Sequence, residues 1–128
     1  MTIEEVPPSP WVEISEDVRL RCMVEANGTA LVMYRMNPGT RFAPHAHPVA
    51  ELGVVLSGRG RCRLGDASRV LEAGDAFYIP PGVVHDFVAY DEAPVVMLNV
   101  TVPLQLDEEP LTVENLTNLV TRLTAPKA

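Results

Sequence analysis

Short runs of β-type residues, each ended by glycine, proline, asparagine or aspartate, recur over residues 18–102 and restrict the chain to an all-β fold. In the first run Val18, Leu20 and Cys22 alternate with arginine, which is the period-two pattern of a strand buried on one face. An Asn-Gly pair, which favours a hairpin turn, separates it from a second run at 30–36. The later runs are 51–56, 59–64, 69–71, 76–79, 85–89 and 95–102. This spacing predicts a β-sandwich or a closed barrel.

The length of 128 residues predicts a single domain with one core. Residues 1–17 are rich in proline and predict an extended arm anchored by Trp11. The barrel is expected over 18–104. Residues 105–128 are expected to form an acidic linker and a short C-terminal helix, because four apolar residues there recur at helical spacing. They are Leu116, Leu119, Val120 and Leu123.

The charge pattern argues against a nucleic-acid partner, and the hydropathy pattern argues against a membrane span. The formal net charge is −7 and every Lys or Arg stands alone, so the basic patch that nucleic-acid binding requires is missing. The apolar stretch at 95–100 is far shorter than the roughly 20 residues that a membrane span needs, and the acidic N-terminus does not resemble a secretory signal. The protein is therefore expected in the cytoplasm.

Cys22 and Cys62 lack metal-binding or redox spacing and are expected to be reduced structural residues.

Three histidines and one glutamate form the candidate metal site. His45 and His47 are two residues apart, so on an extended segment both imidazoles point to the same side. Glu51 follows where the next β run begins, and His85 comes after a rigid turn at 80–82. Three nitrogens and one carboxylate suit a divalent ion such as Fe, Mn, Co, Ni or Zn. These are all the histidines of the chain, which favours a metal site over three unrelated surface or core residues. Such a site leaves one or two coordination positions open for water, substrate or dioxygen.

Two glycine-rich and proline-rich segments around these residues resemble the motifs of the cupin family. The first reads Gly39-x5-His45-x-His47-x3-Glu51-x6-Gly58, and the second reads Gly74-x5-Pro80-x-Gly82-x2-His85. At the last position of the second motif the family has asparagine and this chain has Ala89. The resemblance implies a double-stranded β-helix, a jelly-roll barrel of the RmlC-like type, with the metal near its centre. It also implies a homodimer.

Further residues are candidates for the wall of a cavity inside such a barrel. Tyr34 and Met36 share one strand face, and Asn99 and Thr101 share another. Phe87 lies two residues beyond His85 and is expected to face the same interior as an apolar wall. Ordinary packing or surface exposure is the alternative interpretation for each pair.

The charged residues near the site are expected to face outward. Arg59, Arg61 and Arg63 share one face of their strand, which predicts a solvated outer face, the alternative being an anion-binding wall inside the barrel. Asp86 is adjacent to His85 and so is expected on the opposite face, away from the cavity. No histidine is left to activate a serine, so covalent catalysis is not expected, and neither is an organic cofactor.

The resemblance leaves several functions open. The layout is similar to that of small single-domain cupins that linearise unsaturated uronates, but the acid, aromatic residue and arginine with which that group handles substrate are replaced by Asn99, Thr101 and Gln105. Cupins that cleave flavonols or diketone-like substrates resemble this site in retaining the glutamate. A metal-dependent enzyme acting on a small oxygenated organic molecule is therefore expected, with dioxygenase-type chemistry ahead of a non-redox lyase, isomerase or cyclase. A third possibility is a sensor or binding module without catalysis, since the fold hosts both.

Overall fold

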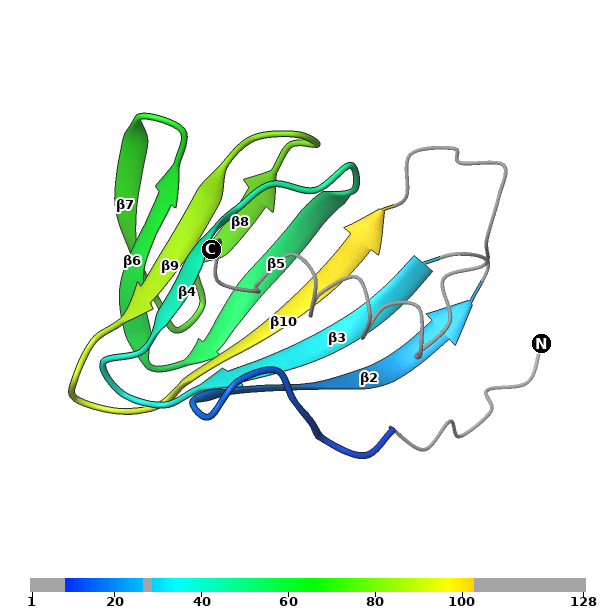
Figure 1. The fold of residues 1–128 in the computed structure, drawn as a ribbon, viewed down its shortest axis with the longest axis horizontal. Helices are drawn as coiled ribbons and strands as arrows, with labels where there is room; N and C mark the ends of the chain where they lie inside the picture. The colour runs from blue at the N-terminus through cyan, green and yellow to red at the C-terminus, as the bar shows by residue number, and fades with distance from the viewer. Residues whose placement is uncertain (1–8, 27–28, 103–128) are drawn as a thin grey trace.

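A computed structural model describes residues 9–26 and 29–102, and within them the chain forms two antiparallel sheets that face each other (Figure 1). One sheet has the order β1 (Val12–Glu13), β2 (Val18–Ala26), β3 (Thr29–Met36), β10 (Val95–Val102), β5 (Ala50–Ser57) and β8 (Ala76–Ile79). The other has the order β4 (Arg41–His45), β9 (His85–Ala89), β6 (Arg59–Leu64) and β7 (Ala67–Glu72). We call them the six-stranded and the four-stranded sheet. The expected all-β barrel is confirmed.

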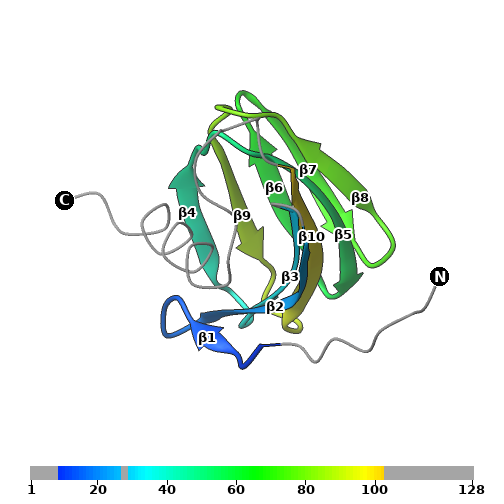
Figure 2. The ribbon, with the colours of Figure 1, turned by 90° about the vertical axis from the view of Figure 1, so that its right-hand side faces the viewer.

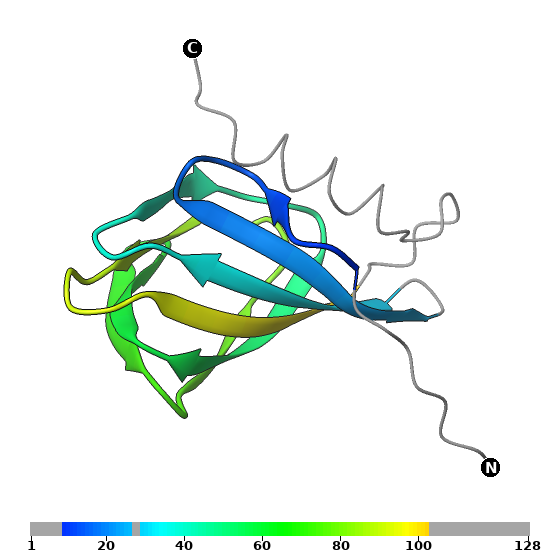
Figure 3. The ribbon, with the colours of Figure 1, turned by 90° about the horizontal axis from the view of Figure 1, so that it is seen from below.

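The two sheets curve around a common interior (Figures 2 and 3). Along β2 and β3, buried residues alternate with partly exposed ones, as the period-two pattern predicts. The inward residues join those of β9 and β10 in one apolar core, whose largest fully buried side chains are Leu20, Met36, Val32, Val55 and Val95. Each such side chain contributes about 1.5–3 kcal/mol by leaving water, so this core accounts for much of the stability of the barrel.

One strand, β4, was not expected from the sequence, and another, β1, was expected only as part of an extended arm. Arg41–His45 forms β4, which pairs with β9, although Pro44 interrupts its β pattern. Val12–Glu13 forms β1, which pairs with β2 at the edge of the six-stranded sheet. Residues 9–11 also lie along this edge: Ser9 donates its N–H to the carbonyl oxygen of Cys22 at 2.9 Å, and the guanidinium groups of Arg19 and Arg21 lie over Trp11, at 5.8 and 5.0 Å from its ring centre.

The turns of the barrel explain part of the motif pattern. Gly58 has a φ of +77°, and a Cβ there would lie 2.3 Å from the carbonyl oxygen of Pro94, so this turn accepts only glycine without rearrangement. Ala89, which replaces the asparagine of the family pattern, is buried in the core and donates its N–H to the carbonyl of Thr40 at 2.8 Å. The backbone of β9 is therefore anchored without the missing amide side chain.

Several expectations concern residues that the structure does not describe. The C-terminal helix and acidic linker at 105–128, and the turn at 27–28, lie outside the described residues. Within the described part of the chain, no helix has the length and apolar character needed to cross a membrane. Cys22 is buried and Cys62 half-buried, and both are free thiols.

Candidate metal centre

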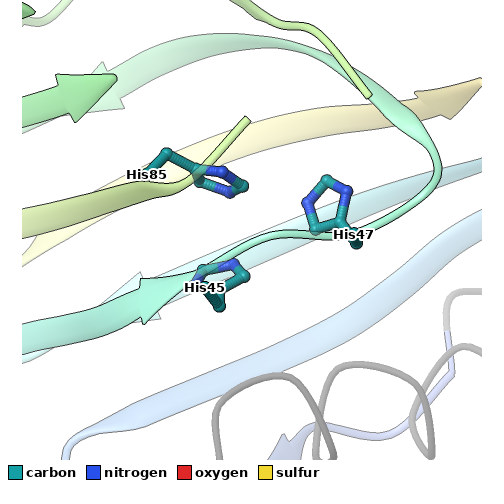
Figure 4. Close-up of side chains that lie close together, drawn as sticks. All are labelled: His45, His47 and His85. Atoms are coloured by element: carbon teal, nitrogen blue, oxygen red, sulfur yellow. The ribbon is translucent and has the colours of Figure 1, made fainter. Parts of the chain in front are cut away.

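The three histidines come together at one end of the four-stranded sheet. His45 ends β4 and pairs across the sheet with His85, which begins β9, while His47 lies in the loop after β4 (Figure 4). The ring centres of His45 and His85 are 4.3 Å apart, and that of His47 lies 5.7 and 4.9 Å from them. One nitrogen of each ring lies within 4.8 Å of the corresponding nitrogens of the other two. The three imidazoles can therefore bind one ion.

Backbone carbonyl groups determine which nitrogen each histidine presents to an ion. Nδ1 of His45 lies 2.7 Å from the carbonyl oxygen of Ala43, Nδ1 of His47 lies 2.7 Å from that of Val49, and Nδ1 of His85 lies 2.9 Å from that of Val83. A carbonyl oxygen only accepts hydrogen bonds, so each Nδ1 carries a proton. Each Nε2 of a neutral ring is then left with a free lone pair, which is the form that a metal ion requires.

A backbone hydrogen bond joins the loop between β8 and β9, which belongs to the second sequence motif, to the first motif. Gly82, in the turn that precedes His85, donates its N–H to the carbonyl oxygen of His47 at 2.8 Å. This bond joins the loop that carries His47 to the turn that aims His85. The sequence motif thus has a physical basis, because the rigid Pro-Pro-Gly turn positions two of the three imidazoles.

Glu51 approaches the histidines from the six-stranded sheet. It is the second residue of β5, only 8% exposed, and its Oε1 lies 3.1 Å from Nε2 of His47. Burial alone would raise the pKa of Glu51, but His47, His85 and His45 outweigh it and lower that pKa, so the side chain is a carboxylate. Burial would likewise lower the pKa of His47, but the hydrogen bond and charge of Glu51 outweigh it and raise that pKa.

The other two histidines are held in the neutral form. Burial lowers the pKa of His45 and of His85, and their neighbouring histidines add to this effect. Three imidazoles and a neighbouring carboxylate are donor types that suit a divalent ion of borderline softness. A metal ion competes with a proton for Nε2 of His47, because it binds only the deprotonated nitrogen.

A cavity of about 60 Å³ lies against these four residues, between the two sheets. Of the residues expected to line it, Tyr34, Phe87, Asn99 and Thr101 do so. Met36 does not line the cavity and is fully buried in the apolar core. The strand β3 extends beyond the cavity, so Tyr34 faces the cavity while the next inward residue, Met36, faces the core. The rest of the wall is largely apolar and includes Phe42, Val49, Leu71, Phe77, Ile79 and Met97.

Cys62 also lines the cavity, although its spacing indicated only a structural role. It pairs with Phe87 across β6 and β9, so its side chain shares the inner face, and burial raises the pKa of its thiol. The signal was present in the sequence, since Cys62 alternates with Arg61 and Arg63, which are exposed on the outer face as expected. Arg59 is exposed in the same way.

Asp86 has the outward partners that its place next to His85 predicts. Its carboxylate is buried, yet it accepts a hydrogen bond at 3.0 Å from Arg41 on β4 and lies 3.4 Å from a guanidinium nitrogen of Arg63 on β6. Both arginine side chains are more than half exposed. Asp86 therefore joins three neighbouring strands through its carboxylate, although, contrary to expectation, it is also among the residues that line the cavity.

Comparison with known proteins places this geometry in a family. A family model described as a cupin domain matches residues 32–101. An H2HPP isomerase from Bacillus subtilis is 32% identical over 80 residues, or 62% of this chain, and the match spans about a third (34%) of the isomerase. The structure of KdgF from Halomonas sp. superposes with a TM-score of 0.67 at 23% identity and covers 77% of this chain and 90% of that one. Recombinant oxalate oxidase in complex with glycolate superposes with a TM-score of 0.54 at 26% identity. That match covers 58% of this chain and 41% of the oxalate oxidase chain.

Proposed function

This chain belongs to the cupin family, and on that premise we propose that it is a metal-dependent enzyme that acts on a small oxygenated organic molecule, with dioxygenase-type chemistry. The observation that carries the proposal is the set of three Nε2 atoms and one carboxylate beside a cavity, each imidazole oriented by a backbone carbonyl. His45, His47, Glu51 and His85 would hold the ion. When bound, a redox-active metal would supply the activation of dioxygen or of an oxygenated substrate.

The cavity supports a small substrate. Its volume of about 60 Å³ is well below the roughly 300–1,000 Å³ of pockets that enclose drug-sized ligands. Phe42, Phe77 and Phe87 make much of the wall apolar, while the proposed metal ligands, Asp86 and a few uncharged polar side chains supply its charged or hydrogen-bonding groups. A largely apolar cavity also accommodates dioxygen, which needs no hydrogen-bond partner. A molecule with few carbon atoms fits better than a flavonol.

A second candidate is a non-redox isomerase or lyase, and Tyr34 is the observation that favours it. Its side chain is buried on the cavity wall, and burial, together with the nearby charge of Glu51, raises its pKa well above the usual value. The hydroxyl group is therefore protonated at neutral pH and can hold a proton next to a substrate. The matching isomerase from Bacillus subtilis supports this class, although the match spans only about a third of that protein.

Metal content and oxygen uptake distinguish these candidates. Elemental mass spectrometry on protein purified without added metal should find about one equivalent of Fe, Mn or Ni in the wild type and none in Glu51→Ala/His85→Ala. Oxygen uptake with short hydroxy acids, diketones and phenols then tests the redox proposal. Tightly bound zinc without oxygen uptake would favour the non-redox alternative. A wild type that binds no metal after reconstitution would contradict both and point to a metal-free binding module.

We also propose that the protein is a homodimer that associates through the outer face of the six-stranded sheet. Register places Leu52 between Val100 and Tyr78, and the side chains of Leu52 and Tyr78 are 47% and 53% exposed. An exposed apolar face suits a two-fold interface, in which the same surface of both subunits meets. Sedimentation velocity should show a dimer for the wild type and a monomer for Leu52→Glu. The matched variant Val70→Glu, on the outer face of the other sheet, should stay dimeric, and a monomeric wild type would contradict the proposal.

A further inference from the structure

Two buried polar side chains on β10 face the cavity next to the metal ligands. Asn99 is 5% exposed and Thr101 is 3% exposed, and both line the cavity wall. On the neighbouring strands Asn99 lies between Val32 and Gly53, neither of which carries a polar side chain. Thr101 lies between Ala30 and Glu51. The sheet itself therefore offers these two side chains almost no hydrogen-bond partner.

The hydrogen bond that the Asn99 side chain makes to Glu51 determines how its amide is oriented. Its Nδ2 donates to Oε2 of Glu51 at 3.3 Å, across 48 positions in the sequence. The reverse orientation would place two acceptor oxygens against each other, so the amide oxygen must point away from the carboxylate. Within the described residues, Oδ1 of Asn99 and Oγ1 of Thr101 are buried without a hydrogen-bond partner.

Gly53 makes room for this arrangement. A Cβ at position 53 would lie 2.3 Å from Cζ of Phe77 and 2.7 Å from Oδ1 of Asn99. The absence of a side chain lets the Asn99 amide lie across β5 while Phe77 closes the other side. Buried polar atoms that lack a partner are costly and rare in folded proteins, and they cluster where a ligand supplies the missing bond.

We propose that Asn99 and Thr101 recognise the hydroxyl group of a small α-hydroxy acid, an inference that rests on the proposed metal-dependent function. Oδ1 of Asn99 can only accept a hydrogen bond, so the ligand must carry an O–H or N–H donor there. Oγ1 of Thr101 can donate to or accept from the same hydroxyl group.

The net charge of the metal site favours a ligand that carries a carboxylate group. Glu51 is the one carboxylate among the four proposed ligands, so a divalent ion bound by it and by three neutral imidazoles retains one positive charge. An anionic oxygen of the ligand balances that charge in a largely apolar cavity, where unpaired charge is unfavourable. The ligand therefore combines a carboxylate with an adjacent hydroxyl group, and the cavity limits it to a few heavy atoms.

The test compares two acids of the same heavy-atom count, of which only one carries a hydrogen-bond donor. Wild-type protein loaded with Mn(II) is titrated by calorimetry with glycolate and with propionate, in which a methyl group takes the place of the hydroxyl group. Glycolate should bind at least about 10-fold tighter, because a site built around a hydroxyl discriminates against ligands that lack it. In Asn99→Leu and in Thr101→Val this preference should fall to within about 3-fold. Thr29→Val makes the same substitution outside the cavity, on the outer face of β3, and should keep the preference.

Manganese content, measured on the same samples, separates the possible failures. Thr101 is not a proposed ligand, so Thr101→Val should keep about one equivalent of metal and report on recognition alone, even if Asn99→Leu disturbs Glu51. A wild type that holds manganese but binds both acids equally would overturn this inference alone, as would a preference that survives in both variants. A wild type that holds no metal would overturn the proposed function and this inference with it.

Discussion

Two buried carboxylates on opposite sides of the barrel wall have different partners. Glu51 faces the cavity, where it contacts Nε2 of His47 and the amide of Asn99. Asp86 is equally buried, but its carboxylate pairs with Arg41 and Arg63, which balance its charge from the outer side. An arginine keeps its charge under all ordinary conditions, whereas a histidine gives up its proton to a metal ion. The same chemical group therefore holds strands together on one side and is available for binding on the other.

The largest effect in this comparison is expected for Glu51→Gln, which keeps the shape of the side chain and removes its charge. Metal affinity should fall roughly 100-fold or more, because the only charged donor of the four becomes a neutral amide. The free energy of unfolding of the metal-free protein should change by less than about 1 kcal/mol, since no fixed positive charge loses its partner. Competition with a chelator and urea unfolding measure the two quantities. Unchanged metal affinity would show that Glu51 is not a ligand.

The next effect is expected for the double variant Arg41→Met/Arg63→Met, which leaves Asp86 buried without a charge partner. We expect a loss of about 2 kcal/mol in the free energy of unfolding, less than for a fully buried pair because both arginines are more than half exposed. Metal content should stay at the wild-type level. Urea unfolding of the metal-free protein gives the first quantity and elemental mass spectrometry the second. A variant that keeps the wild-type free energy of unfolding but loses its metal would contradict the assignment, because Asp86 would then serve metal binding and not stability.

A smaller effect is expected for Asp86→Asn. The substitution removes the charge but keeps a hydrogen-bond acceptor, and the released arginines can be hydrated where they stand. The free energy of unfolding should therefore fall by about 1 kcal/mol, with metal affinity unchanged. Thermal or urea unfolding measures the change. A fall in metal affinity as large as that for Glu51→Gln would mean that the outer ion pairs set the positions of His45 and His85.

The smallest effect is expected for Arg61→Met, the control for Arg63. Arg61 shares the outer face of β6 with Arg63, but it has no carboxylate partner among the described residues, and its side-chain contact is a 3.5 Å hydrogen bond to Ser68. The free energy of unfolding should change by less than about 0.5 kcal/mol. Urea unfolding beside Arg63→Met provides the comparison. Equal losses for the two variants would mean that net charge, and not the pairing with Asp86, stabilises this face.

Local patterns predicted most of the fold. The alternation along 18–22 predicted the buried face of that strand correctly, and Tyr34 and Met36 share one face as expected, because the side-chain period of a strand depends only on the backbone. β4 was missed because Pro44 breaks its propensity, and pairing with β9 outweighs that local signal. For Met36 the alternative of ordinary core packing holds, since periodicity gives the face of a strand but not how far along it the cavity reaches.

The sequence by itself determined the donor types of the candidate site, their spacing and the strands that carry them. His45, His47, Glu51 and His85 could be named in advance because motifs and strand periodicity are local. Only the tertiary structure decided that β5 of one sheet brings Glu51 to histidines of the other, that Asn99 orients its amide on that carboxylate, and that Asp86 turns to arginines outside. The physical reason is that these contacts join residues far apart in the sequence, and they depend on strand register and barrel closure, which no local pattern encodes.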